Sequence, residues 1–232
     1  MKLIQFVKQE LKGWKNFEII GLIIVLLTIL STSIILKDSP AAVINAICGI
    51  LYTIIAGKGK ISCYFFGLAG SAGYVYLSFQ NALWGNLLLY LCYYIPMQIL
   101  GIFRWKKHLK HDSKEIIKTK LSKSELTKLI AVAIIGSITA IVLLKYFGDK
   151  SPIVDGITTA LSIVGMYLTV KRCIEQWIVW MIVNGLSVIM WLKLIQQGTK
   201  AYATVIMWAV YFILAVYFYV IWKKEIKRLD NN

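Results

Sequence analysis

Residues 127–146 read TKLIAVAIIGSITAIVLLKY, and the charged residues in this stretch are Lys128 and Lys145, close to its two ends. A helix rises about 1.5 Å per residue, so this stretch would be about 30 Å long, which matches the hydrocarbon thickness of a bilayer. The whole chain has the same character, because 59% of its 232 residues are hydrophobic, 16% are charged and the mean hydropathy is +0.70. Soluble domains are about a quarter charged. The composition therefore predicts an integral membrane protein that crosses the bilayer several times.

Seven further apolar runs of similar length flank this stretch, and short polar breaks separate them. A spanning helix needs about 20 mostly apolar residues, so we expect an all-α membrane protein with eight transmembrane helices. No small-residue cleavage site follows the first run, and we expect an uncleaved helix there rather than a signal peptide. The eight predicted spans are residues 17–36, 41–57, 61–79, 84–103, 127–146, 153–170, 174–195 and 202–222.

The distribution of Lys and Arg predicts the orientation of these helices. Of the 26 basic residues, 21 lie in alternate segments, namely the N-terminus, 58–60, 104–128, 171–172 and the tail from 223. Cytoplasmic loops of membrane proteins are enriched in Lys and Arg, so we expect both termini and the basic loop to be cytoplasmic. The net charge of +15 is then a topology signal. We expect the lipid bilayer, and not nucleic acid, to be the partner of this basic chain.

The chain contains a weak internal repeat. Ser39-Pro40 and Ser151-Pro152 each open an apolar helix, 112 residues apart, and Trp105 and Trp222 each lie at the basic end of a third helix, 117 residues apart. Both copies begin outside and end inside, so we expect two parallel three-helix repeats joined by the helix at 127–146. Parallel repeats occur in transporters, where the substrate site lies between the halves near the midplane. The predicted domains are an N-terminal cytoplasmic segment with an extra helix (1–38), a first repeat (39–107), a cytoplasmic loop with the connecting helix (108–150), a second repeat (151–224) and a cytoplasmic tail (225–232).

Polar and aromatic residues inside the predicted seventh helix indicate a binding site. Trp177, Trp180 and Asn184 follow the spacing i, i+3, i+7 and therefore share one face of the helix. Indole rings can stack against a flat ligand, and a carboxamide can both donate and accept hydrogen bonds. The alternative is an aromatic belt at the membrane interface. It fits Trp177 better than Trp180, because Trp177 lies closer to Lys171-Arg172.

The predicted fourth helix carries a second group of polar residues. Gln98 lies six residues from Arg104, which places it about 9 Å below the cytoplasmic surface. An unpaired carboxamide at that depth is costly, so Gln98 is expected to face a cavity or a partner helix, and a purely structural helix–helix contact is the alternative to a site. Pro96 removes a backbone donor and can kink the helix close to Gln98. Face and depth add three further candidates, Tyr94, Tyr90 and Asn86.

Metal, cofactor and enzyme chemistry find no support in the sequence. The four cysteines are isolated, with no CxxC pair and no His at a metal-ligand spacing, so we expect no metal site and no cofactor. Asp155 and Glu175 lie at opposite ends of their spans, so paired carboxylates of a membrane enzyme are not expected, and we expect no catalytic residues. A seven-helix sensor would need a deep ligand-linking lysine, and Lys193 lies near a helix end.

The chain resembles the PnuC family over residues 39–224. The resemblance rests on the 3+1+3 layout and on two motifs, Trp177-xx-Trp180-xxx-Asn184 and Tyr94-Ile95-Pro96-Met97-Gln98 with Gly101 and Trp105 following. PnuC proteins are bacterial nicotinamide riboside transporters with a fold similar to the sugar-transporting SWEET proteins. The resemblance implies facilitated diffusion of nicotinamide riboside by a homotrimer in the inner membrane, without ATP or a coupling ion. Uptake would be maintained by intracellular phosphorylation of the riboside.

The same resemblance implies roles for the candidate residues. Trp177 and Trp180 would pack against the substrate, whose pyridinium ring is a flat cation that indole faces attract by about 0.5–2 kcal/mol. Asn184 and Gln98 would hydrogen-bond its carboxamide or ribose. No Lys or Arg is expected at that depth, so the riboside and not its 5′-phosphate is expected to be carried. A uniporter of a related vitamin such as thiamine and a seven-helix-type membrane sensor are the alternatives.

Overall fold

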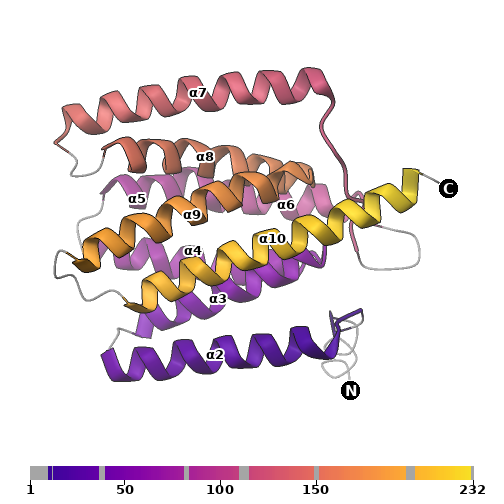
Figure 1. Cartoon of the computed structure of the whole chain (residues 1–232), viewed down its shortest axis with the longest axis horizontal. Helices are drawn as coiled ribbons and strands as arrows, with labels where there is room; N and C mark the ends of the chain where they lie inside the picture. The colour runs from indigo at the N-terminus through magenta and orange to yellow at the C-terminus, as the bar shows by residue number, and fades with distance from the viewer. Residues whose placement is uncertain are drawn as a thin grey trace. The chain divides into compact units, whose positions relative to one another are not determined.

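The computed structural model describes residues 10–11, 13–36, 40–80, 84–109, 115–148, 152–196 and 202–230. Its order of helices is drawn in Figure 1. The helices are α2 (Asn16–Leu36), α3 (Pro40–Gly57), α4 (Cys63–Gln80), α5 (Trp84–Leu89), the π-helix η1 (Tyr90–Tyr94), α6 (Ile95–Lys106), α7 (Lys123–Tyr146), α8 (Pro152–Lys171), α9 (Glu175–Gln196) and α10 (Tyr202–Asp230). Because α5, η1 and α6 follow one another without a break, these named helices form eight helical segments. The predicted all-α membrane class and the eight helices are confirmed.

Length and hydropathy mark five of these segments as long and apolar enough to cross a membrane. They are Asn16–Ile35, Leu87–Lys106, Lys123–Tyr146, Pro152–Lys171 and Val205–Leu229, and α3 and α9 contribute shorter apolar stretches, Val43–Gly57 and Glu175–Met190. Many large apolar side chains on these helices are exposed, among them Ile34, Ile135 and Val142. Exposed apolar surface of this extent is what a lipid environment requires.

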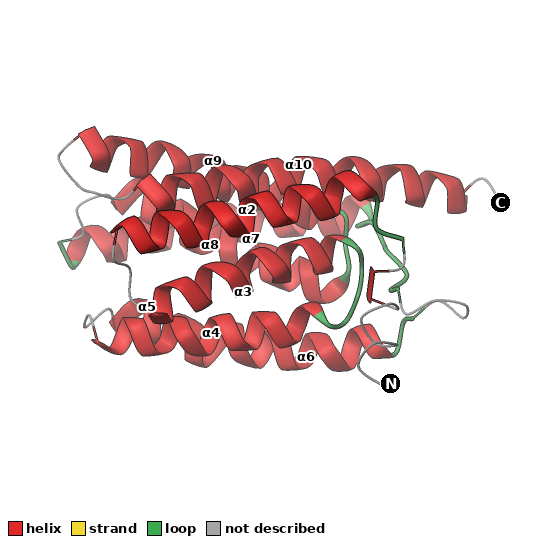
Figure 2. Ribbon diagram, turned by 90° about the horizontal axis from the view of Figure 1, so that it is seen from below, coloured by secondary structure: helices red, strands yellow, loops and turns green. Residues whose placement is uncertain are grey.

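Residue contacts divide the chain into two compact units, Met1–Ile95 and Pro96–Asn232. In the first unit α3 packs against α2 and α4, and α4 packs against α5 and η1. In the second unit α8 packs between α7 and α9, and α9 packs against α10. The side-by-side course of α9 and α10 is visible in Figure 2.

Close packing in the second unit depends on a glycine of α8. A Cβ atom at Gly156 would lie 2.6 Å from Ile141 Cγ1 and 2.7 Å from Ile141 N on α7. Only a residue without a side chain permits this approach. Nearer the other end of α8, Val164, Leu168 and Cys173 form a buried cluster. Leu121, Leu129, Ala133 and Val179 pack against that cluster.

Two helices are longer than their apolar runs. α7 begins at Lys123, four residues before the predicted start, because Ser122 and Glu125 form a capping box that satisfies the first backbone N–H groups. α10 continues to Asp230, past the predicted end at 222. In this extension Glu225 accepts a hydrogen bond from Lys118, and Ile226 is buried. Hydropathy locates the membrane-spanning part of a helix, whereas caps and ion pairs decide where the helix ends.

The π-helix lies directly before Pro96. Ile95 N donates to Tyr90 O, a bond that reaches back five residues. Pro96 has no N–H and cannot donate to a carbonyl in the preceding turn, so one wide turn is accommodated there. The predicted irregularity of the fourth span at Pro96 therefore takes the form of a π-helix, which ends one residue before the boundary between the two units.

Candidate functional site

The predicted stripe on the seventh span lies on α9, and its three residues differ in environment. Trp177 is only 3% exposed, and its ring packs against Phe218 at 5.4 Å and against Trp222 at 5.6 Å between centroids. Both partners belong to α10. Trp177 therefore attaches α9 to α10 and does not face lipid, so the interfacial-belt alternative is wrong for this residue.

The indole nitrogen of Trp177 is buried and has no hydrogen-bond partner among the residues that the structure describes. A buried donor without an acceptor is costly, because burial removes its hydrogen bonds to water. The N–H of Trp177 has therefore lost its hydrogen bond to water without gaining one from a described residue.

Trp180 lies one turn further along α9 and is half-buried. Its Nε1 donates to Thr169 Oγ1 of α8 at 3.3 Å. Its ring lies so close to Gly165 that a Cβ atom there would be 3.0 Å from both Cε2 and Cζ2. Trp180 therefore rests against the backbone of α8 while part of its surface stays accessible.

The two carboxamide candidates of the second unit are both buried, Asn184 at 4% and Gln98 at 5% exposure. Asn184 is four residues beyond Trp180 on α9, and Gln98 is on α6. The indole of Trp105, also on α6, donates to Thr169 O at 3.0 Å, which ties α6 to α8. The second unit thus contains four of the seven predicted site residues, Gln98, Trp177, Trp180 and Asn184.

The remaining candidates belong to the first unit. Tyr90 lies 4.3 Å from Tyr74 and 4.7 Å from Tyr94 between ring centroids, so three tyrosines from α4 and η1 form one aromatic row. The side chain of Asn86, on α5, lies outside the described residues. The structure therefore brings Tyr90 and Tyr94 together.

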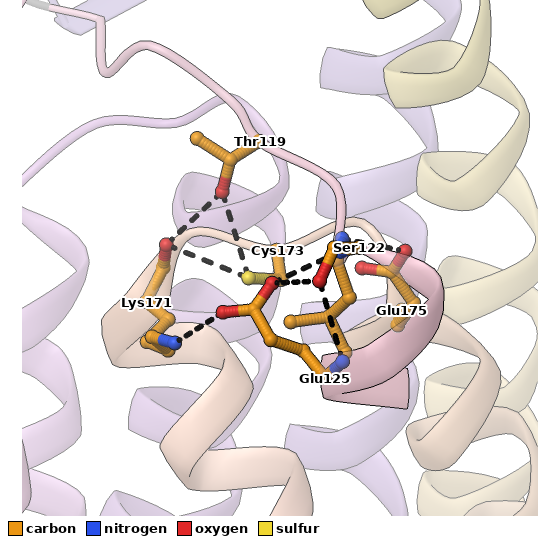
Figure 3. A network of polar contacts seen from close by, with 7 residues as sticks. Thr119, Ser122, Glu125, Lys171, Cys173 and Glu175 are labelled. Carbon is orange, nitrogen blue, oxygen red and sulfur yellow. Dashed lines mark hydrogen bonds and ion pairs between the residues drawn. The ribbon is translucent and has the colours of Figure 1, made fainter. Parts of the chain in front are cut away.

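The start of α9 is held by the loop that precedes α7. Thr119 N donates to Arg172 O at 3.0 Å and Ile174 N donates to Thr119 O at 2.9 Å. Nearby, Leu121 N donates to Glu175 Oε1 at 3.0 Å. Figure 3 shows the side chains of Thr119, Cys173 and Glu175 around this contact. Burial raises the pKa of the Cys173 thiol in this network, so the sulfur stays protonated. The segment positions the helix that carries Trp177 and Trp180.

The sequence analysis did not identify Gly165 and Thr169, the two residues of α8 that contact the ring of Trp180. They are four residues apart and therefore on one face of α8. A glycine and a threonine four residues apart inside an apolar run could have indicated a close helix contact. The spacing does not indicate which neighbouring helix the two residues face. Among the described residues, no group of three His, Cys, Asp or Glu side chains could hold a metal ion.

Comparison with known proteins identifies the family. The family model described as "Nicotinamide mononucleotide transporter" matches residues 39–224, which is most of the chain. The chain is 31% identical over 233 aligned residues to the nicotinamide riboside transporter PnuC of Neisseria mucosa, covering 98% of this chain and 89% of that protein. The chain belongs to the PnuC family. It is therefore a multi-pass membrane transporter and not an enzyme.

Two further PnuC proteins agree with this assignment. The nicotinamide riboside transporter PnuC of Haemophilus influenzae is 31% identical to the chain, covering 99% of this chain and all of that protein. A crystal structure described as that of the vitamin B3 transporter PnuC is also similar to the chain, with a TM-score of 0.81 and 33% sequence identity. The match covers 95% of the chain described here and 97% of the chain in the crystal structure. The likeness covers nearly the whole chain and therefore includes residues of both units.

Proposed function

We propose that this PnuC chain carries nicotinamide riboside across a bacterial inner membrane by facilitated diffusion. The observation that carries the proposal is the stripe on α9, where Trp180 is half-buried and Trp177 and Asn184 are buried, in a chain whose relatives are named nicotinamide riboside transporters. The ligand combines a flat cationic ring with a carboxamide and a ribose. Indole faces attract the first, and side-chain amides pair with the others.

Each candidate residue has a proposed task. The ring of Trp180 supports the pyridinium, and the N–H of Trp177, which has no partner among the described residues, donates to an acceptor of the ligand. Asn184 and Gln98 hydrogen-bond the carboxamide or the ribose hydroxyls. Tyr94, Tyr90 and Asn86, which belong to the first unit, are also proposed as substrate-binding residues.

We also propose that the riboside is transported and its 5′-phosphate is not. The matching family model names the mononucleotide, whereas the relatives are named for the riboside. The four candidates of the second unit, two indoles and two carboxamides, carry no formal charge. A phosphate dianion moved out of water needs a cationic partner, and these residues offer none.

The proposed architecture is two parallel three-helix repeats, 39–107 and 151–224, joined by α7 and preceded by α2. It is supported by two helix ends of the same kind. Gly59 follows one helix with a positive φ of 71°, and Arg172 follows the other with a positive φ of 64°. Both termini are proposed to be cytoplasmic, since the basic segments alternate along the chain. The proposed assembly is a homotrimer, and net uptake is proposed to follow phosphorylation of the riboside inside the cell.

Uptake into proteoliposomes tests the function. Labelled nicotinamide riboside, nicotinamide mononucleotide and thiamine are offered separately, with and without proton and sodium gradients. We expect the riboside to equilibrate at a rate that neither gradient changes, and the mononucleotide to be excluded. Faster uptake of thiamine would make the chain a carrier of a related vitamin, and accumulation driven by a gradient would overturn facilitated diffusion.

A further inference from the structure

Trp180 is held by two residues of the neighbouring helix α8. The ring lies against Gly165, where a Cβ atom would meet Cε2 and Cζ2 at 3.0 Å and Cδ2 at 3.3 Å. These distances are shorter than ordinary van der Waals contacts, so the ring reaches this position because residue 165 has no side chain. At the same time Nε1 donates to Thr169 Oγ1 at 3.3 Å. One contact fixes how near the ring lies to α8, and the other fixes which edge of the ring points to it.

Thr169 is itself held from several sides. Its hydroxyl donates to Gly165 O at 2.9 Å, so the oxygen presents a lone pair to Trp180. Its carbonyl accepts from Trp105 Nε1 and from Arg172 N, both at 3.0 Å. The residue is 2% exposed. The position of Thr169 is therefore set by α6 and by the α8–α9 turn. Because the indole of Trp180 is bonded to the Thr169 hydroxyl, its orientation depends on that position.

We propose that Gly165 and Thr169 are positioning residues that fix the indole of Trp180 as a platform for a planar cation and thereby make the site selective for a charged over an uncharged form of the same ring. This inference rests on the proposed function. Attraction between a cation and an indole depends on the cation lying over the ring face, so a ring free to rotate about its side-chain bonds loses part of that attraction. Because the N–H is already bonded to Thr169, Trp180 offers the ligand its ring and no competing donor.

Two variants distinguish the effect of the hydroxyl at residue 169 from the effect of the side chain's shape. They are Thr169→Val and Thr169→Ser. Valine keeps the branched shape and the backbone carbonyl that Trp105 needs. It removes the hydroxyl, and with it the acceptor for Trp180 and the bond within α8 to Gly165 O. Loss of one hydrogen bond that orients the ring predicts an affinity for nicotinamide riboside about three- to tenfold weaker. Serine keeps the acceptor and is expected to restore the affinity to within about twofold of wild type.

Gly165→Ala tests the close approach of the ring. The indole has to move by a few tenths of an ångström while Thr169 still holds its nitrogen, and we expect an affinity loss of about tenfold. Gly136→Ala is the matched control, because a Cβ atom there meets Ala160 Cβ at 3.6 Å, an ordinary contact between α7 and α8. It is expected to bind like wild type.

The experiment measures binding of nicotinamide riboside and of its uncharged dihydro form by calorimetry, on purified protein in detergent, for wild type and the four variants. Thermal unfolding checks that each variant is folded. Ultraviolet resonance Raman spectra of the same samples report the indole N–H hydrogen bond of the tryptophans. We expect Thr169→Val to shift that band, and to weaken binding of the cation more than binding of the dihydro form, whereas Thr169→Ser does neither.

The outcomes separate the two proposals. Wild-type protein that does not bind the riboside overturns the proposed function. Wild-type protein that binds it, with Thr169→Val and Gly165→Ala binding equally well, overturns the positioning role alone. Equal losses for the cation and the dihydro form overturn the selectivity, and an unshifted N–H band in folded Thr169→Val overturns the orienting bond.

Discussion

Two helix ends, one in each unit, share a backbone conformation and differ in what surrounds it. At the end of α3, Gly59 has a φ of 71°, and the next residue donates its N–H to the carbonyl five residues back at 3.2 Å. At the end of α8, Arg172 has a φ of 64°, and the corresponding bond is 3.0 Å. Both are Schellman caps. They lie 113 residues apart, and the proposed repeat would align the residues of the two units at this offset.

At this offset the large and small residues beside the caps are interchanged. Trp180 of α9 corresponds to Gly67 of α4, and Gly165 of α8 corresponds to Tyr52 of α3. In the second unit the large ring therefore stands on the later helix, whereas in the first unit it stands on the earlier one. The comparison teaches that two units with the same cap can carry an indole on the later helix in one unit and a glycine at the corresponding position in the other. The proposed site on α9 would use this asymmetry to bind a single ligand.

The two caps also differ in how the positive φ is tolerated. Gly59 has no side chain and adopts this conformation without strain. For Arg172 the same conformation costs about 1–2 kcal/mol, and neighbouring bonds offset the cost. Arg172 Nη1 donates to Ile117 O at 2.8 Å, and Arg172 O accepts from Thr119 N at 3.0 Å. The loop that lies against the second cap therefore helps to stabilise it.

The largest expected effect is on ligand affinity, and it tests whether the two units differ at the proposed site. Asn184→Ala or Trp180→Ala should weaken binding of nicotinamide riboside about ten- to a hundredfold, because a polar group of the ligand loses its partner or the cation loses its ring. Ser71→Ala, at the position of the first unit that corresponds to Asn184, should change affinity less than about threefold. Calorimetry measures the affinities and size-exclusion chromatography checks assembly. Equal losses in the two units would refute the asymmetry.

A smaller effect concerns the two caps. Gly59→Ala places a side chain at a positive φ and should lower the free energy of unfolding by about 1–2 kcal/mol. Arg172→Gly should have a smaller effect, since the strain it relieves offsets the bond to Ile117 that it loses. Thermal unfolding in detergent measures both, with Gly21→Ala as control because no atom lies within 4 Å of a Cβ there. A Gly59→Ala protein as stable as wild type would show that the first cap does not need glycine.

The smallest effect concerns the loop that stabilises the second cap. Ser122→Ala removes the side chain that accepts from Glu125 N at 3.3 Å at the start of α7 and should cost about 1 kcal/mol of stability. Lys171→Met removes an ion pair with Glu125 that lies at the surface, at 3.3 Å, and should leave Tm unchanged within error. If thermal unfolding ranks the two in the opposite order, the ion pair and not the cap holds this loop.

The sequence predicted the helices well because apolar length is a property of contiguous residues. All eight predicted spans correspond to helical segments, and the largest differences are at the ends of α7 and α10. Those ends depend on Ser122 and on the pair of Lys118 with Glu225, which join residues that hydropathy does not relate. The predicted domains and the cytoplasmic location of the termini stay predictions.

The candidate site was predicted in part. Helical spacing brought Trp177, Trp180 and Asn184 to one face, and depth selected Gln98. The different environments of the two tryptophans could not be read from spacing. Trp177 packs against Phe218 at 5.4 Å, on a helix that follows it in the chain, and Trp180 bonds to Thr169, on a helix that precedes it.

The amino-acid sequence by itself determined that this chain is a multi-pass helical transporter of the PnuC family. Hydropathy, charge alternation and short motifs are properties of contiguous residues, so they can be recognised before the packing of the helices is known. Only the tertiary structure decided that Trp180 rests on Gly165 and that its nitrogen is held by Thr169. The physical reason is that a side chain's orientation depends on short-range contacts with another helix. Such contacts join residues that are distant in sequence, and no periodicity within one helix specifies them.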